Sequence, residues 1–208
     1  MTFNAVVQPF MMLNEREQAV LAPAQQQGRV RLLQLLSRAV TASVRDETGQ
    51  PDVGSEGADE CVAHYRLECD GLLDNLKDYA ADLEQNDLEL VLKDEQQTRF
   101  NQLIRINEPA VFVPQYFFYP IWVQERGLRR PLFVGSTPRL LDELAIINKV
   151  LGLFIPDKMP AFLDATEEDL EDYPFGRGSE LWVNLGFVFL QKLAEAGNKH
   201  RLPIIINL

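Results

Sequence analysis

The chain has 208 residues, of which 46% are apolar and 25% are charged, and its formal net charge is −11. These proportions are typical of a folded globular protein and exclude collagen-like, low-complexity and wholly disordered chains. The acidic excess argues against a protein that coats nucleic acid or an anionic membrane. A chain of this length can bury one substantial core, so we expect a single compact domain over residues 1–208.

The first residues lack the features of a secretory signal, because no Lys or Arg precedes Arg16 and Pro9 interrupts the apolar stretch. No apolar run approaches the roughly 18 residues that a membrane span requires. The two cysteines, Cys61 and Cys69, fall in a segment predicted to be helical, where a rise of about 1.5 Å per residue separates them by about 12 Å. A disulfide tolerates roughly 7 Å, so we expect a cytoplasmic protein without one.

The N-terminal third is expected to contain one strand, a helix that starts at Asn14 and is broken or restarted at Pro23, and a second, long helix. Residues 1–13 are largely apolar and are predicted to pack as a strand or an extended arm. Residues 24–46 have the period of an amphipathic helix. Its buried face is predicted to comprise Val30, Leu33, Leu36, Val40 and Val44. Residues 46–59 are rich in Gly and acidic residues and contain almost nothing apolar, which predicts an exposed loop.

The strongest periodic signal covers residues 62–83, where apolar residues alternate at intervals of three and four positions. These residues are Val62, Tyr65, Cys69, Leu72, Leu76, Tyr79 and Leu83. The spacing predicts a long helix whose apolar seam packs inside the chain or, less favourably for so short a seam, pairs with a second chain. Asn86 and Glu89 form a capping-box pattern that predicts a second helix ending near Ile106. The two helices should form an antiparallel hairpin.

Strand-forming residues dominate from Ala110 onward. Strands are predicted at 110–113, 115–124 and 130–135, and a hairpin loop joins the last two. Pro114 and Pro120 place the aromatic middle strand at an edge or a bend, because Pro cannot donate a ladder hydrogen bond. Helices are predicted over 137–152 and 179–197 from their capping residues, and residues 202–208 should form a buried strand.

Together these elements predict an α+β fold. It would comprise an N-terminal long-helix hairpin or bundle, followed by a small, mostly antiparallel sheet packed by two helices. The composition changes at residue 108, which suggests a subdivision of the single domain into a helical part at 1–107 and an α+β part at 108–208.

The acidity of the chain is local, since residues 51–100 carry a net charge of −10 while residues 101–150 carry +2. Within the predicted helix of residues 62–83, Asp70, Asp74, Asp78 and Asp82 recur every four positions and should lie side by side. An acidic face of this kind attracts a basic protein partner. The leading interpretation is therefore a non-enzymatic interaction domain, such as a cytoplasmic inhibitor or immunity-type protein for a basic toxin.

The second interpretation is a small enzyme or ligand-binding domain with an anion site at residues 135–139. Backbone N–H groups at a helix start attract anions, and Arg139 adds positive charge. The site would comprise Ser136, Thr137, Arg139, Arg177, Tyr116, Tyr119 and Trp122. The competing explanation is ordinary capping by Ser136 or Thr137, which satisfies the same N–H groups.

A metal site is a weaker hypothesis. Glu60, His64 and Glu68 would share one face of the predicted helix, but their spacing differs from the Glu-x-x-His pattern of di-iron proteins. A solvated helix face is the simpler explanation, so no metal is expected. No cofactor is expected either, because nucleophile-elbow, zinc, phosphate-loop and dinucleotide motifs are absent from the sequence.

Two further patterns concern surfaces. Acidic residues cluster between Asp164 and Asp172, which indicates a solvated surface or a partner contact rather than a calcium loop. Arg126, Arg129 and Arg130 lie beside the aromatic strand, where a soluble hairpin tip is favoured over a site for single-stranded nucleic acid. We therefore expect neither a nucleic-acid nor a membrane partner. A homo-oligomer formed through the aromatic strand or the seam is the third interpretation.

Overall fold

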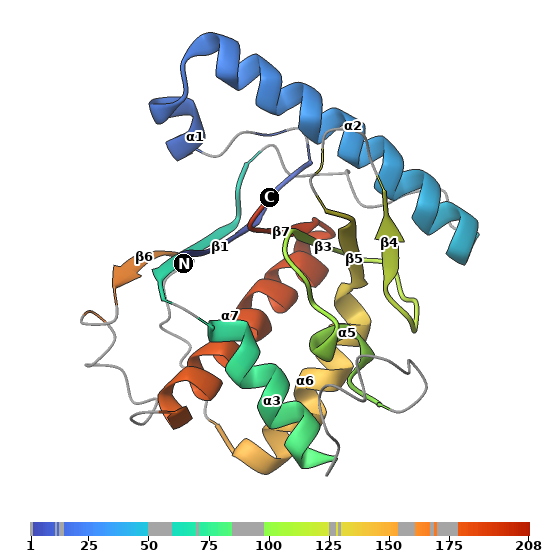
Figure 1. Ribbon diagram of the computed structural model, residues 1–208, viewed down its shortest axis with the longest axis vertical. Helices are drawn as coiled ribbons and strands as arrows, with labels where there is room; N and C mark the ends of the chain where they lie inside the picture. Colours follow the sequence, from blue (N-terminus) through green and yellow to red (C-terminus); the bar gives the residue numbers. More distant parts are fainter. Residues whose placement is uncertain are drawn as a thin grey trace.

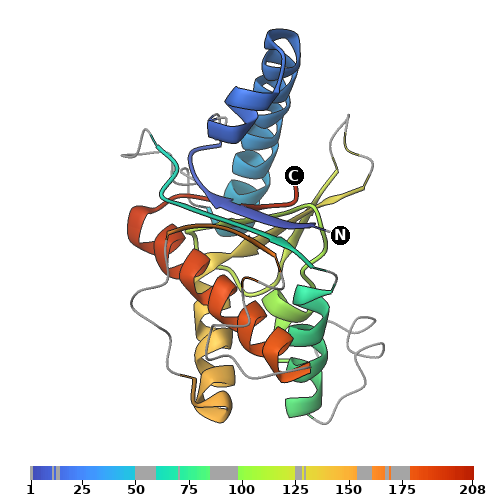
Figure 2. The same ribbon diagram turned by 90° about the vertical axis from the view of Figure 1, so that its left-hand side faces the viewer.

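The computed structural model describes residues 2–10, 12, 15–49, 60–69, 71–84, 98–124, 128, 130–153, 161–166, 169 and 179–208. Within these residues, one sheet of seven strands separates two layers of helices (Figure 1 and Figure 2). The strands are β1 (Thr2–Val7), β2 (Ala63–Glu68), β3 (Ala110–Val113), β4 (Ile121–Val123), β5 (Leu132–Ser136), β6 (Phe162–Thr166) and β7 (Ile204–Ile206). The helices are α1 (Glu15–Val20), α2 (Pro23–Thr48), α3 (Leu72–Leu83), α5 (Asn101–Ile104), α6 (Thr137–Leu151) and α7 (Ser179–His200).

The strand order of the sheet is β4-β5-β3-β7-β1-β2-β6. β7 is antiparallel both to β3 and to β1, so it joins the two sides of the sheet. β3 and β5 are parallel, and so are β2 and β6, while β1 with β2 and β4 with β5 are antiparallel. This mixed sheet and its helices are consistent with the predicted α+β class.

The prediction that residues 62–83 form one helix was wrong, because residues 63–68 form strand β2. Ala63, Tyr65 and Leu67 are buried, whereas the residues between them are only partly buried. This period of two is typical of a strand with one face in the core. In residues 63–67 this strand period competes with the helical spacing of three and four positions. The helical spacing includes Tyr65 but omits Leu67, which is buried.

A glycine separates β2 from α3. Gly71 has a φ of 74°, a left-handed conformation that glycine adopts readily because it lacks a Cβ atom. The predicted helical hairpin is therefore also wrong in its described part, since α3 begins at Leu72 and residues 101–104 form only the short helix α5. The predicted cap at Asn86 and Glu89 lies outside the described residues.

Most other elements lie where the sequence predicts them. α2 covers the predicted helix of residues 24–46, and α6 ends at Leu151, followed by Gly152, whose φ is 61°. β1 confirms a strand within residues 1–13, and β7 confirms the strand within 202–208. The predicted hairpin is confirmed as the antiparallel pair β4 and β5, and β4 lies at the edge of the sheet. The aromatic strand is shorter than predicted, because β4 covers only Ile121–Val123.

The larger core lies between the sheet and the layer formed by α3, α6 and α7 (Figure 2). Phe189 of α7 stacks on Tyr65 of β2 and Phe3 of β1, with ring centroids 5.2 and 6.3 Å away. These contacts hold α7 against the sheet, and α3 packs beside α7 in the same layer (Figure 2). The position of α3 therefore depends on its contact with α7.

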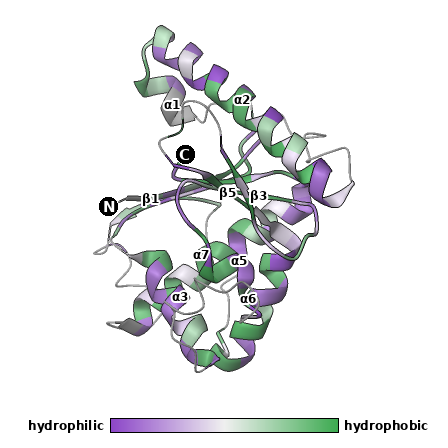
Figure 3. Cartoon of the chain, turned by 45° about the vertical axis from the view of Figure 1, so that its right-hand side comes forward, coloured by the Kyte–Doolittle hydropathy of each residue, from purple (hydrophilic) through white to green (hydrophobic). Residues whose placement is uncertain are grey.

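α2 covers the opposite face of the sheet. Its residues Leu36, Val40 and Val44 pack with Val111 of β3 and Ile205 of β7. Figure 3 shows hydrophobic and hydrophilic residues following one another along this helix, as an amphipathic helix requires. The first half of α2 extends beyond the sheet (Figure 2), and no residue from 23 to 32 is buried.

Replacing Gly186 of α7 with alanine should lower the free energy of unfolding by about 1–3 kcal/mol. A Cβ atom added at Gly186 would lie 2.9 Å from the backbone carbonyl oxygen of Leu72, which cannot move without displacing α3. Gly28 of α2 is the matched control, because a Cβ atom there meets nothing within 4 Å. Alanine at Gly28 should instead stabilise the protein by about 0.5–1 kcal/mol through its helix propensity. Urea unfolding followed by circular dichroism measures both, and effects of the same sign would contradict the close packing of α3 on α7.

Candidate functional site

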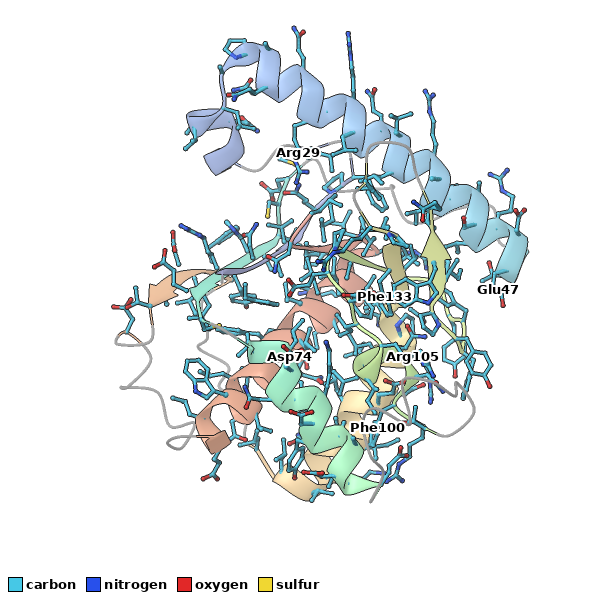
Figure 4. The ribbon with its side chains drawn as sticks, viewed as in Figure 1. Arg29, Glu47, Asp74, Phe100, Arg105 and Phe133 are labelled. Atoms are coloured by element: carbon cyan, nitrogen blue, oxygen red, sulfur yellow. The ribbon has the colours of Figure 1, made fainter. Side chains whose placement is uncertain are left out.

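The acidic face of α3 consists of Asp74, Asp78 and Asp82, which are exposed and lie four residues apart. Residues at this spacing project from one side of a helix, while Leu72 and Leu76 are buried on the other side. The structure thus brings together three of the four predicted aspartates, and Asp70 lies outside the described residues. Figure 4 labels Asp74 on the first turn of α3, across the sheet from α2.

The three aspartates differ in their position relative to the helix dipole and in their charged neighbours. Asp74 lies in the first turn, where the positive end of the helix dipole favours an acid, and its Oδ1 accepts a hydrogen bond from Lys77 Nζ at 3.1 Å. Asp82 lies in the last turn, which contains no basic residue. The negative end of the dipole and the neighbouring Asp78 both disfavour a carboxylate there. Helix stability alone therefore does not explain the acidic residues at positions 78 and 82.

Glu84, which follows α3, does not belong to this face. Its side chain is only 12% exposed and accepts a hydrogen bond from Thr98 Oγ1 at 2.7 Å. Arg99 places its Nε 3.1 Å from the same carboxylate and also donates its backbone N–H to it. Glu84 thus ties the segment before α5 to the end of α3.

The strand-to-helix turn at residues 135–139 satisfies the Ser136 hydroxyl and the Arg139 guanidinium internally, whereas the buried Thr137 Oγ1 has no hydrogen-bond partner among the described residues. Ser136 and Thr137 are fully buried, and Ser136 Oγ accepts a hydrogen bond from the backbone N–H of Arg139 at 3.2 Å. The Arg139 guanidinium donates to the carbonyl oxygen of Arg99 at 2.7 Å and lies 4.5 Å from the ring centroid of Phe118. These contacts favour helix capping over an anion site at this turn.

The aromatic residues predicted around that turn are on the surface. Tyr116 is 53% exposed, and Tyr119 and Trp122 are also exposed. Tyr119 packs edge-on against Phe118, while Trp122 packs against Phe133 of β5. Figure 4 labels Phe133 in the sheet, above the helical layer. Arg177, the remaining member of this predicted site, lies outside the described residues.

Glu143 of α6 is a fully buried acid that the sequence analysis missed. Its two carboxyl oxygens accept hydrogen bonds from the backbone N–H of Gln102 at 3.0 and 3.1 Å, and Oε2 also accepts from Leu103 N at 2.9 Å. Burial raises the pKa of Glu143 to about 8, against the opposing effects of these N–H groups and of Arg139, while Asp142 adds to the increase. Burial thus favours the neutral form of this carboxyl group, while its hydrogen bonds and Arg139 favour the charged form.

Gln102 extends this buried polar centre to the neighbouring segments. Its Nε2 donates to the carbonyl oxygen of Phe118 at 2.9 Å, and its Oε1 accepts from the backbone N–H of Ser136 at 2.9 Å. The Arg139 Nε lies 3.4 Å from Glu143 Oε1. Only the spacing of Arg139 and Glu143 on one helix could have indicated this centre in the sequence, because Gln102 is remote along the chain.

The geometry assumed for a metal site was wrong, since His64 and Glu68 lie on a strand and Glu60 precedes it. Four residues span about 13 Å along a strand, too far for His64 and Glu68 to meet as helix neighbours would. His64 Nε2 instead lies 2.8 Å from Asn4 Oδ1 of β1. Among the residues that the structure describes, no group of three or more His, Cys, Asp or Glu side chains is placed to hold a metal ion.

Cys61 lies before β2 and Cys69 directly after it, and the two form no disulfide. The helix assumed for them was wrong. An extended strand separates Cys61 from Cys69 by more than a helix would, at about 3.3 Å per residue, so the conclusion about the disulfide holds.

The acidic segment between Asp164 and Asp172 is described only in part. Asp164 Oδ2 lies 3.6 Å from Arg66 Nη1 of the neighbouring strand β2. Asp169 accepts hydrogen bonds from the backbone N–H and the hydroxyl of Thr166, and these lower the pKa of Asp169. Of the three arginines at the predicted hairpin tip, Arg130 is exposed, and Arg126 and Arg129 lie outside the described residues.

Across the described ranges, no helix is both long enough and apolar enough to span a lipid bilayer. Comparison with known proteins gives no match of this chain to a protein family, to a curated protein or to a solved structure.

Proposed function

We propose that this chain is a non-enzymatic protein-interaction domain that binds a basic partner through the acidic face of α3. The observation that supports this proposal is the exposed row of Asp74, Asp78 and Asp82 on one side of the helix. Asp78 and Asp82 lie where helix energetics disfavour acids. Their presence is therefore better explained by an interaction outside the chain than by the stability of α3.

A cytoplasmic inhibitor or immunity-type protein that masks a basic toxin is the concrete form of this proposal. The net charge of −11 over the whole chain adds a long-range negative potential that attracts a basic partner. Opposite potentials accelerate association and orient the two partners before contact. The same potential repels nucleic acid and anionic membranes, which makes a basic protein surface the favoured target.

Neutralising the acidic face should weaken the binding of a cationic probe about tenfold. The probe is a fluorescent decalysine peptide, and the variant is the triple substitution Asp74→Asn, Asp78→Asn, Asp82→Asn. Each exposed ion pair contributes about 0.5 kcal/mol, so three contribute about 1.5 kcal/mol, or about tenfold in the dissociation constant. Fluorescence anisotropy at low and physiological salt measures the affinity, and the difference between wild type and variant should shrink as salt increases.

A matched triple variant separates a located face from overall charge. Asp46→Asn, Glu47→Gln and Glu60→Gln remove the same charge from exposed positions away from α3. This control should weaken the binding of the decalysine peptide by no more than about threefold, since charges farther away than a Debye length are screened. Equal losses for the two triple variants would refute the proposal, because binding would then follow net charge alone. The α3 variant should remain within about 0.5 kcal/mol of wild-type stability, as relief of repulsion offsets the lost pair with Lys77.

A further inference from the structure

A cavity of about 190 Å³ lies beside the first turn of α3. Its walls come from segments far apart in the sequence: β1, α3, the residues before β3, the segment before β5 and the segment after β7. Phe3, Leu72 and Leu73 supply apolar surface, and Glu108, Arg130 and Lys77 supply charge. The cavity is smaller than the pockets of drug-sized ligands, which measure about 300–1,000 Å³, and it corresponds to about six water molecules.

The carboxylate of Glu108 is held in a fixed position in this cavity. Its Oε2 accepts a hydrogen bond from Asn207 Nδ2 at 2.6 Å. Asn207 is itself fixed to β1, because its Oδ1 accepts from the backbone N–H of Asn4 at 2.8 Å and its backbone N–H donates to the Asn4 carbonyl. A carboxylate oriented in advance binds a cationic group with little loss of conformational entropy.

The two cations of the cavity differ in whether an acidic side chain neutralises them. Lys77 is only 16% exposed in its side chain, and its ammonium group is already neutralised by Asp74 at 3.1 Å. Arg130 is exposed and forms no ion pair with any residue that the structure describes. The cavity therefore presents one carboxylate and one guanidinium that lack charged partners among these residues.

Charge and size together select the ligand. A purely cationic ligand would be repelled by Arg130, and a purely anionic ligand would be repelled by Glu108. A ligand with both charges satisfies both side chains, and the apolar wall favours an aliphatic group between them. We propose that this cavity binds a free α-amino acid with an apolar side chain, whose ammonium group meets Glu108 and whose carboxylate meets Arg130. This inference does not rest on the proposed binding of a basic partner.

Isothermal titration calorimetry with three related probes tests the charge requirement on the wild-type protein. L-leucine should bind with a dissociation constant of 1 mM or lower. L-leucinamide lacks the carboxylate and N-acetyl-L-leucine lacks the ammonium group, so each should bind at least tenfold more weakly. Absence of binding by leucine, alanine and methionine at 10 mM would overturn the proposal, and so would equal binding of leucine and its two analogues.

Substitutions in the cavity assign the two contacts. Glu108→Gln should weaken the binding of leucine at least tenfold, while N-acetyl-L-leucine should bind as well as before or better, because its repulsion by Glu108 is removed. The glutamine carbonyl can still accept the hydrogen bond from Asn207. Arg130→Gln should weaken the binding of leucine at least tenfold, while leucinamide should bind as well as before or better, because its repulsion by Arg130 is removed. Glu60→Gln and Arg31→Gln remove the same charges from exposed positions elsewhere and should have no effect. Wild-type affinity in both cavity variants would overturn the proposal, and if Glu108→Gln fails to fold, Arg130→Gln and the analogue series decide.

Discussion

Replacing Glu143 with alanine should lower the free energy of unfolding by about 3–5 kcal/mol. The substitution removes the acceptor for the backbone N–H groups of Gln102 and Leu103, leaves both buried without a partner, and opens a cavity beneath α6. It also removes the carboxyl group that lies beside the guanidinium of Arg139. These effects act together at one buried point that connects α5, α6 and the end of β5.

Asp142→Ala is the matched control, because Asp142 is the neighbouring acid on the same helix and is exposed. Its replacement should change stability by no more than about 0.5 kcal/mol. Urea unfolding monitored by circular dichroism and by tryptophan fluorescence measures both variants. If Glu143→Ala is as mild as Asp142→Ala, the carboxyl group does not support α5 in the way described.

Wild-type stability should decrease as the pH rises from 4.5 to 8, through the contribution of Glu143. The ordinary pKa of this residue is 4.5, and burial raises the pKa to about 8 in the folded protein. Between these values the unfolded chain releases the proton while the folded protein retains it, so rising pH favours unfolding. The contribution is fully present below the lower value and is lost by the upper one. It amounts to about 5 kcal/mol if the whole shift is realised.

Glu143→Gln isolates this contribution, because glutamine has a similar shape and does not titrate. The unfolding free energies of both proteins are to be measured at half-unit intervals from pH 4.5 to 8.5. The stability of the wild type relative to the variant should decline through this window and then become constant. Parallel pH profiles would show that the carboxyl group has the same protonation state in the folded and unfolded chains.

The sequence was informative where one signal dominated a segment. The apolar face of α2 is continuous, so Leu36, Val40 and Val44 could be placed in the core before the structure was known. The capping residues and Gly152 delimited α6 in the same way. In residues 61–69, by contrast, a strand period and a heptad period overlap, and the choice depends on whether β1 and β6 are available as partners. That information is tertiary and does not lie within the segment.

The candidate sites follow the same distinction. The acidic face of α3 was predictable because its spacing is local to one helix. Residues 72–83 are helical as predicted, although residues 63–68 form a strand. The buried centre at Glu143 depends on backbone N–H groups of α5 about forty positions earlier. No local sequence pattern indicates a contact between residues so far apart. The cavity beside α3 draws on residues from Phe3 to Asn207, so only the completed fold assembles it.

The position of β7 has a consequence for how the protein is made. β7 is synthesised after every other described strand, yet it is the only strand that pairs with both β1 and β3 in the described sheet. Until residues 204–206 leave the ribosome, β1 and β3 each present an unpaired edge to the solvent or to another nascent chain. Such edges promote intermolecular pairing, and contacts between the first and last strands form slowly. We therefore expect nascent chains of this protein to depend on chaperones, or on rapid completion of synthesis, to avoid aggregation.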